Sequence, residues 1–377
     1  MESGGTVSDQ AEPVNINLTR VVVAMSGGVD SSVAAALLRD AGYEVIGITM
    51  KLWSDKTDST HHHPCCLSQD VNDARCVCQL LGIPHYVCSL EAEFQKYVID
   101  YFCQEYSRGR TPNPCLACNH YMKFHFLMDK ALSLDAQYLA TGHYARIEHS
   151  ADKYRLLESV DPSKDQSYVL YTLGQPELAH LLLPLGNSCK SEVRHLASHL
   201  GLPVASKPDS QEICFIPDGD CRSFVARRFP QTPGDIVDSR GHLLGHHTGI
   251  AGYTIGQRQG LGLASKRRLY VIDIDAQNNT LVVGGEEDIF SDTLWATRVH
   301  WVSGEAASKP VPVAAKIRYR SPKTEAVLWP QDKGVRLVFS KPQRAITPGQ
   351  AVVFYQGEEV LGGGIIESAH AKIPAGF

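Results

Sequence analysis

The stretch Val21–Ser32 reads VVVAMSGGVDSS and carries the strongest structural signal of the chain. Its first residues are mostly β-branched and apolar, which favours a buried strand. The glycines and serines that follow lead into alanine-rich residues up to Ala41, which favour a helix. A glycine turn between a strand and a helix presents backbone N–H groups at the positive end of the helix dipole. The stretch therefore predicts a phosphate-binding loop.

Asp30 is the acidic residue of this loop, and its carboxylate would repel a bound phosphate. Two arrangements remove the conflict, because Asp30 can cap the helix or hold Mg²⁺, which prefers oxygen ligands. We expect the metal role. The loop matches neither GxxxxGK[ST] nor GxGxxG, so it belongs to neither of those nucleotide-binding classes.

Short apolar strands alternate with helical patterns in the first part of the chain. This alternation predicts a parallel sheet with helices on both faces, and therefore an α/β fold. Strands are expected at Val21–Met25, Glu44–Met50, His85–Cys88 and Gln137–Thr141, and helices at Asp30–Ala41, Leu67–Gly82, Glu91–Ser107, Asn119–Leu134 and Lys190–Leu200.

From about residue 209, glycine and proline become frequent and strand-like runs dominate. We expect a disordered leader at 1–18, a nucleotide-binding and catalytic domain at 19–208, a small mixed central domain at 209–287 and a C-terminal β domain at 288–377. A hairpin is expected around Gln277–Asn279, and short strands at Val311–Tyr319, Ala326–Trp329, Arg336–Phe339 and Ala351–Tyr355.

Composition narrows the classes of function. A hydrophobic fraction of 43% and a charged fraction of 20% are ordinary for a globular protein, and no apolar run approaches the roughly 20 residues that span a bilayer. The first eighteen residues lack the basic and apolar regions of a signal peptide, so a cytoplasmic protein is expected. Residues 301–350 hold nine Lys or Arg and three acids, a local charge of 9 − 3 = +6. Such a face binds a polyanion or is merely solvated, and the pattern alone favours solvation.

Eleven cysteines are an odd count, and in the cytosol most are expected to be free thiols packed as small apolar residues. Cys115 and Cys118 form a CxxC within TPNPCLACN, residues 111–119. Pro112 and Pro114 fix φ and suggest a stiff turn. A pair of this kind binds a metal ion, forms a disulfide or reacts as thiolates, and the spacing alone does not decide between these alternatives.

The loop and further motifs along the chain resemble those of a known protein family. SGGVDSS resembles the PP-loop of the ATP pyrophosphatases, and six ordered blocks resemble the tRNA-specific 2-thiouridylase family from about Val21 to Glu367. The blocks are Arg110–Pro114 with Cys118, Asn119, Lys123 and Phe124; Ala140–Tyr144; Lys164–Tyr168; Asp209–Ile216; Thr254–Arg258 with Gly260–Gly262; and Arg318–Arg320 with Thr347–Gln350.

The resemblance implies a PP-loop domain of the adenine-nucleotide hydrolase type, a central tRNA-binding domain and a C-terminal β-barrel-like domain. It implies an enzyme that adenylates the C2 oxygen of the wobble uridine in tRNAs for Lys, Glu and Gln and replaces that oxygen with sulfur. A cysteine desulfurase or a sulfur-relay protein would be the donor, and the free chain would be a monomer. The alternatives are an amide-forming PP-loop synthetase and an RNA-binding protein with a relict loop.

The resemblance also assigns binding residues, block by block. ATP with Mg²⁺ would lie against Ala24, Met25, Ser26, Gly27, Gly28, Val29, Asp30 and Ser31, with Met50 and Gly142 at the adenosine end. The tRNA would contact Asn113, Pro114 and Cys115 near the target base, and His143, Lys164, Asp165, Gln166, Arg318, Tyr319 and Gln350 elsewhere.

The catalytic assignment rests on three cysteines. Cys214 would carry sulfur as a persulfide, and Cys118 would then attack it and leave a Cys118–Cys214 disulfide for a reductant. Many family members have Asp at the position of Cys115, with an acid/base role that a thiol would fill less well. The alternatives are that the three cysteines hold a [4Fe–4S] cluster with one open iron, or that Cys115 is a small buried thiol. A structural zinc site would require a fourth ligand.

Overall fold

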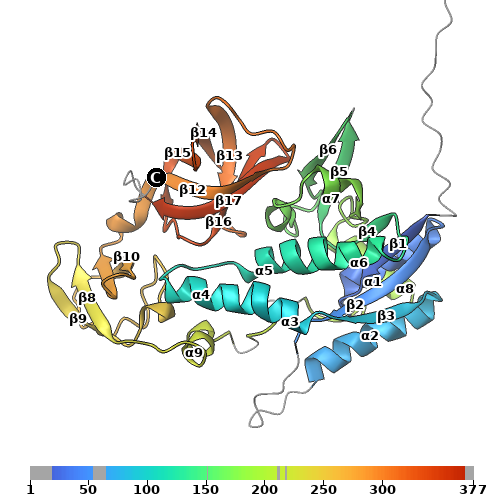
Figure 1. Ribbon diagram of the computed structural model, residues 1–377, viewed down its shortest axis with the longest axis horizontal. Coiled ribbons are helices and arrows are strands. Elements are labelled where there is room, and N and C mark those ends of the chain that lie inside the picture. Colours follow the sequence, from blue (N-terminus) through green and yellow to red (C-terminus); the bar gives the residue numbers. More distant parts are fainter. Residues whose placement is uncertain (1–18, 54–64, 151, 210–212, 217–218, 370–377) are drawn as a thin grey trace, which may run out of the picture.

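The computed structural model describes residues 19–53, 65–150, 152–209, 213–216 and 219–369 (Figure 1). The expected leader at 1–18 lies outside these ranges. The described residues form a five-stranded sheet with helices, a four-stranded sheet and an eight-stranded sheet. Within the described part, no helix has the length and apolarity needed to cross a bilayer.

The five-stranded sheet has the order β3-β2-β1-β4-β7, and all its neighbouring strands are parallel. This confirms the predicted parallel sheet, with the strand of the opening stretch at its centre. The strands are β1 (Arg20–Ala24), β2 (Glu44–Lys51), β3 (His85–Ser89), β4 (Tyr138–Ala140) and β7 (Leu181–Leu182).

Strand β1 is buried on both faces, which explains its continuous β-branched run. Val21 and Val23 pack in the core formed with α1 (Val29–Asp40), α2 (Cys65–Leu81) and α8 (Lys190–His199). Val22 points the other way, because successive side chains of a strand alternate between faces. The sheet therefore has helices on both faces, as predicted.

The helix that carries the CxxC begins earlier than predicted. It starts with α5 at Pro114 rather than at Asn119, because Asn113 caps it and accepts a hydrogen bond from the Cys115 N–H at 3.0 Å. Proline is well suited to the first helical position. The predicted stiff turn is therefore the first turn of a helix, and Cys115 and Cys118 lie on one side of it. The helix runs through α5 (Pro114–Ala117), the π-helical η3 (Cys118–Leu127) and α6 (Met128–Leu132).

A second long helix precedes it and lies beside it in Figure 1. It covers the predicted range 91–107 in three parts, α3 (Glu91–Phe94), η2 (Gln95–Asp100) and α4 (Tyr101–Ser107). Shorter elements are α7 (Gln175–Ala179), α9 (Cys221–Ala226), η4 (Ser167–Leu170), η5 (Ile250–Gly252) and η6 (Glu287–Ile289).

The C-terminal strands close into a barrel, because β12 pairs with both β15 and β17. The predicted short strands are confirmed within it, whereas β12 and β17 were not predicted. The barrel strands are β12 (Phe290–Trp301), β13 (Val311–Lys316), β14 (Thr324–Gln331), β15 (Gly334–Arg344), β16 (Ala351–Gln356) and β17 (Glu359–Ala369).

Two smaller sets of strands complete the fold. The hairpin β5 (Ala145–Ser150) and β6 (Lys153–Glu158) extends the barrel sheet, where Leu157 pairs with Glu359. The central sheet has the order β10-β11-β8-β9, and its β10–β11 hairpin confirms the predicted one. Its strands are β8 (Gly234–Asp238), β9 (Leu243–His247), β10 (Tyr270–Asp275) and β11 (Thr280–Gly284).

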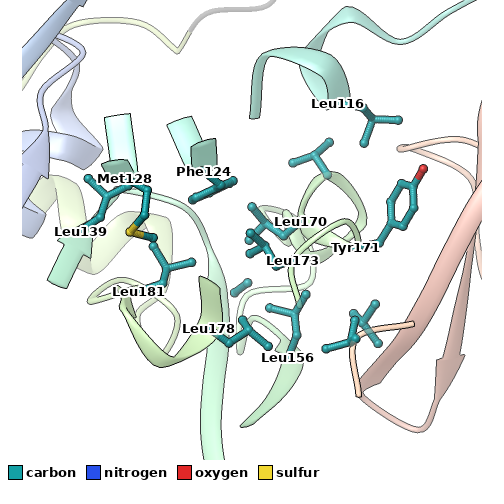
Figure 2. Close-up of a cluster of buried hydrophobic side chains, with 14 of the residues drawn as sticks. Leu116, Phe124, Met128, Leu139, Leu156, Leu170, Tyr171, Leu173, Leu178 and Leu181 are labelled. Carbon is teal, nitrogen blue, oxygen red and sulfur yellow. The ribbon is translucent and has the colours of Figure 1, made fainter. Parts of the chain in front are cut away.

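One apolar core joins the CxxC helix, the parallel sheet and the barrel. Figure 2 shows part of it, with Leu116 and Phe124 of the helix near Leu170 and Tyr171. Residues Ala351, Val353 and Tyr355 of β16 belong to the same cluster. A polar contact reinforces this junction, since the buried Tyr168 hydroxyl donates to the Ala351 carbonyl at 2.9 Å.

Replacing Tyr168 with Phe removes this buried hydrogen bond while keeping the ring in the core. We expect the variant to lose about 1 kcal/mol of stability, seen as a lower midpoint of thermal unfolding. Tyr86→Phe is the matched control, because the Tyr86 side chain is exposed. Equal midpoints for the two variants would contradict a stabilising role for the Tyr168–Ala351 contact.

Candidate active site

The predicted phosphate loop connects β1 to α1 and leaves the start of the helix open. Gly28 occupies the N-cap position of α1, and no side chain caps the helix. Ser31 instead braces the loop, because its hydroxyl accepts from the Ser26 N–H at 3.2 Å and donates to the Gly28 carbonyl. The first N–H groups of α1 are therefore without a side-chain acceptor and face an anion-binding position.

Gly27 fixes the shape of the loop. Its φ is +72°, and a Cβ at this position would lie 2.3 Å from the Asp70 carbonyl oxygen of α2. Both the backbone conformation and the space therefore require glycine.

Asp30 is held by a cation that the sequence analysis did not identify. Its two carboxylate oxygens lie 2.7 and 2.8 Å from Lys190 Nζ, and the Tyr144 hydroxyl donates to it at 2.8 Å. Since Gly28 is the N-cap, Asp30 does not cap the helix, and Lys190 offsets its charge beside the loop. The Mg²⁺ role of Asp30 stays a prediction.

The predicted adenosine-end residues are partly brought together. Gly142 follows β4 and touches the loop, because a Cβ there would lie 2.7 Å from the Asp30 carbonyl carbon and the Ser31 nitrogen. Met25 is buried, and Met50 packs between two apolar clusters. The loop and Gly142 lie at the carboxyl ends of β1 and β4, where open α/β sheets bind their ligands.

The structure gathers the three predicted cysteines around one lysine. The Cys115 and Cys214 side chains are exposed, and Cys118 is half-buried. Desolvation by the protein around it is the main cause that raises the pKa of Cys214 to about 12, and the neighbouring thiols of Cys118 and Cys115 raise it further. Desolvation likewise raises the pKa of Cys118 to about 11 and raises that of Cys115. The ammonium group of Lys123 acts in the opposite direction on all three. Each thiol is therefore protonated at neutral pH, and Lys123 is the group placed to stabilise a thiolate.

Lys123 is held in place by a buried, neutral histidine. Its Nζ lies 3.3 Å from His143 Nε2, which must accept because an ammonium group only donates. The other ring nitrogen, Nδ1, then donates to Thr141 Oγ1 at 2.7 Å. Burial, and next the charge of Lys123, hold the pKa of His143 well below its usual range. His143 therefore orients Lys123 toward the thiols without carrying charge.

The residues predicted near the target base lie at the start of α5. Pro114 occupies the first helical position after the capping Asn113. Tyr319 of the barrel lies near the same place. Its pKa is raised mainly by burial, next by Asp165, and also by the nearby Cys115 thiol. Gln350 joins the two units by donating to the Thr111 carbonyl at 2.8 Å. Part of the predicted tRNA set therefore surrounds the CxxC.

The remaining predicted tRNA residues have partners inside the protein. His143 and Asp165 are buried, with exposed fractions of 7% and 8%. Lys164 forms an ion pair with Asp209 at 2.8 Å, and Gln166 accepts from the Tyr144 N–H. In this conformation these four side chains stabilise the segment around them, and their contact with tRNA stays a prediction.

A cavity of about 370 Å³ lies where the CxxC segment, the central unit and the barrel meet. Two arginines line it, and neither has a carboxylate ion pair within the described residues. Burial and the nearby Arg344 lower the pKa of Arg318, which donates to the Ala345 carbonyl and to Thr347. Two adjacent guanidinium groups without carboxylates suit a phosphate group.

The cysteines do not form a ligand cage as they stand. Cys115, Cys118 and Cys214 are free thiols, and within the described ranges no three His, Cys, Asp or Glu side chains are arranged to hold a metal ion. The thiols influence one another's pKa without meeting as a ligand set. The [4Fe–4S] role of the three cysteines stays a prediction.

Comparisons with known proteins agree with this architecture. Three family models match in order: the tRNA methyl transferase HUP domain at residues 19–218, the tRNA methyl transferase PRC-barrel domain at 222–285, and the Aminomethyltransferase beta-barrel domain at 291–366.

Curated relatives match over nearly the whole chain. The tRNA-specific 2-thiouridylase MnmA 2 of Caldanaerobacter subterraneus is 52% identical, covering 92% of this chain and 98% of that protein. The tRNA-specific 2-thiouridylase MnmA of Acetivibrio thermocellus is 50% identical, covering 92% and 99%. A solved 4-thiouridine synthetase–RNA complex with bound ATP is 17% identical with a TM-score of 0.35, covering 56% of this chain and 50% of that one.

Gly27→Ala should abolish nucleotide binding, because the added methyl group collides with the Asp70 backbone and reshapes the loop. Gly82→Ala is a matched control, since Gly82 has a φ of +69° but a Cβ there meets nothing within 4 Å. Gly82→Ala should lose about 1 kcal/mol of stability from backbone strain, Gly27→Ala should lose more because of the added collision, and only Gly27→Ala should lose ATP binding in calorimetric titration. Equal ATP affinities would contradict the role of this close approach.

The raised thiol pKa of Cys214, about 12, predicts a steep pH dependence of its alkylation. Below its pKa, the reactive thiolate fraction increases tenfold per pH unit, so the rate should increase about 30-fold between pH 8 and 9.5. The same cysteine in urea-unfolded protein, with a pKa near ~8.5, should increase only about fourfold over that range. Rates that rise in parallel in folded and unfolded protein would contradict the raised pKa of Cys214 in the folded protein. Mass spectrometry of the Cys214 peptide after timed iodoacetamide treatment gives both rates.

Proposed function

The chain belongs to the tRNA-specific 2-thiouridylase family, and we propose that it uses ATP to replace the C2 oxygen of the wobble uridine with sulfur. One structural observation carries this proposal. Gly142 touches the phosphate loop, and the next residue, His143, holds the lysine that faces the three thiols. A nucleotide on the loop and a sulfur nucleophile would therefore reach the same base.

The chemistry requires both groups. The C2 oxygen of uracil is a poor leaving group, but its attack on the α-phosphorus of ATP releases pyrophosphate and makes AMP the leaving group. A deprotonated persulfide on Cys214 then adds its terminal sulfur to C2, and AMP departs. The Cys118 thiolate attacks Cys214 Sγ and breaks the S–S bond, which releases the 2-thiouridine and leaves a Cys118–Cys214 disulfide. A dithiol reductant returns two electrons to restore both thiols.

The residues of the chain prepare these steps. The raised thiol pKa values keep Cys118 protonated until substrate is in place, and Lys123 stabilises its thiolate when it forms. Cys115 sits one turn before Cys118, where a protonated thiol can donate to the departing AMP oxygen. This is the role that the family resemblance gives to an acidic residue at this position.

The proposed binding roles are those that the family resemblance assigns. ATP with Mg²⁺ supplies the adenylation, the residues of the loop at 24–31 would hold its phosphates, and Met50 and Gly142 would lie at the adenosine end. Asn113 and Pro114 start the CxxC helix, Tyr319 lies near Cys115, and Gln350 contacts the segment before the helix; these four residues would receive the base.

The substrates and partners proposed are the tRNAs for Lys, Glu and Gln and a sulfur-donor protein of the cysteine desulfurase or sulfur-relay class. The proposed location is the cytoplasm, with a monomeric free chain. The full description of the activity is that of a tRNA-uridine 2-sulfurtransferase.

Cysteine variants test the proposal directly. ATP-dependent tRNA thiolation by Cys214→Ala and Cys118→Ala should decrease by about 10³-fold or more, because each variant lacks a covalent participant. Cys189→Ala is the control, since Cys189 is an exposed free thiol that precedes α8. Full activity of Cys214→Ala would favour an amide-forming synthetase over a thiolase.

The role of Cys115 is tested by measuring iron, acid-labile sulfide and thiolation on anaerobically purified protein. We expect full activity without iron, and a decrease of about 10² in Cys115→Ala from loss of an acid/base group. Activity that rises with cluster content, and that disappears together with iron in Cys115→Ala, would instead assign the three cysteines to a [4Fe–4S] site.

A further inference from the structure

A short segment that contacts the phosphate loop precedes Cys214 in the sequence. Residues 205–209, here called the strap, follow α8, and Cys214 comes five residues after Asp209 in the chain. The strap is held from the side of α8, because Arg194 donates to the carbonyl oxygens of Ala205 and Lys207 at 3.1 Å. Its two charged side chains, Lys207 and Asp209, each connect to the loop.

Lys207 connects the strap to the loop at Gly27. Its ammonium group donates to the Gly27 carbonyl at 2.9 Å and to the carboxylates of Asp70 and Asp73 at 2.7 and 2.5 Å. Three acceptors use all three protons of the ammonium group. Gly27 is also the residue at which an added Cβ would collide with the Asp70 backbone, so loop, α2 and strap meet at one point.

Asp209 connects the strap to the loop at Asp30. Its carboxylate pairs with Lys164 at 2.8 Å, Arg194 at 2.8 Å and Lys190 at 3.0 Å. Lys190 is 10% exposed and pairs in turn with Asp30. Partial burial acts to raise the pKa of Asp209, but hydrogen bonds from Lys164 and Lys190 lower it to about 2, so this carboxylate stays ionised.

The strap is therefore tied to two loop residues, Gly27 and Asp30, that are three positions apart. A phosphate bound to the loop N–H groups would add negative charge beside Asp30, and Lys190 is the buried cation shared between Asp30 and Asp209. Any change in how Lys190 divides its charge between the two carboxylates changes the hold on the strap. A shift of the Gly27 carbonyl would also move Lys207, which donates a hydrogen bond to it, and with Lys207 the strap.

We propose that Lys207 and Asp209 are positioning residues that couple occupancy of the phosphate loop to the placement and access of the Cys214 thiol. This inference rests on the proposed function, in which the loop holds ATP and Cys214 carries sulfur. The coupling ensures that the sulfur-bearing segment takes its working position when nucleotide is bound. By thermodynamic linkage, modification of Cys214 changes the affinity for nucleotide by the same factor.

The test measures the rate at which iodoacetamide alkylates Cys214 in the full-length protein, with and without Mg²⁺ and the non-cleavable analogue α,β-methylene-ATP. Peptide mass spectrometry gives the rate, and Cys189 in the same digest is an internal standard. In the unmodified sequence the analogue should change the rate by about fivefold or more, the lower end of ordinary coupling between sites. In Lys207→Met and Asp209→Asn the analogue should change the Cys214 alkylation rate by less than about twofold, because the coupling between the two sites is lost.

Matched variants separate coupling from general damage. Lys153→Met removes a surface lysine paired with Glu305 at 2.6 Å and should keep the full effect of the analogue. Lys207→Arg keeps the charge and should restore part of the effect. Circular dichroism and calorimetric titration establish that each variant is folded and binds the analogue, and Asp209→Asn carries the test if Lys207→Met does not fold.

The outcomes are distinguishable. If the analogue binds and the Cys214 rate does not change, or if Lys207→Met and Asp209→Asn bind it and keep the full effect, the coupling is overturned while the proposed function stands. If the analogue does not bind to the unmodified sequence, the proposed function itself fails. A rate effect that is present in the unmodified sequence and in Lys153→Met, and lost in both strap variants, supports the proposal.

Discussion

The close approach of two backbones at Gly27 is the constraint on which the site depends. The absence of a side chain lets α2 lie against the loop, and the positive φ turns successive N–H groups toward one position. With α2 in this place, its carboxylates at Asp70 and Asp73 face Lys207. The geometry of the loop, the position of a helix and the course of a distant segment thus follow from one residue without a Cβ.

The thiol site has two parts, the start of the CxxC helix and the His143–Lys123 pair behind it. Cys115 and Cys118 start a helix that Asn113 caps and Pro114 favours, so their spacing along the chain becomes one turn of a helix. Behind them, a neutral histidine orients a lysine instead of acting as an acid or a base. The raised pKa values keep the three thiols protonated although two of them are exposed, and the Lys123 charge is the one that acts to lower all three.

Local patterns predicted the parts of the fold that local forces determine. The strand and helix on either side of SGGVDSS were predicted to within one or two residues, because β1 is buried on both faces and α1 is rich in alanine. The start of the CxxC helix was wrong, although Asn113 before Pro114 is a recognised start signal. Strands β12 and β17 were missed because their half-buried patterns are weak, and three consecutive glycines at 362–364 weaken the strand signal of β17 further. Lys190 and Lys207 were missed because a cation is identified as a partner of the loop only after folding.

The strand β17 has three neighbours, and this has a consequence for cooperativity. It pairs with β16 and β12 in the barrel and, at Glu359, with β6 of the hairpin that extends from the α/β unit. The same junction contains the apolar core shared by β16 and the CxxC helix. Opening of the barrel would therefore expose apolar surface of the α/β unit as well, and the free energies of opening of the two units are linked. We therefore expect the two units to melt together, so that the barrel surface near Cys115 is present only when the thiol site is folded.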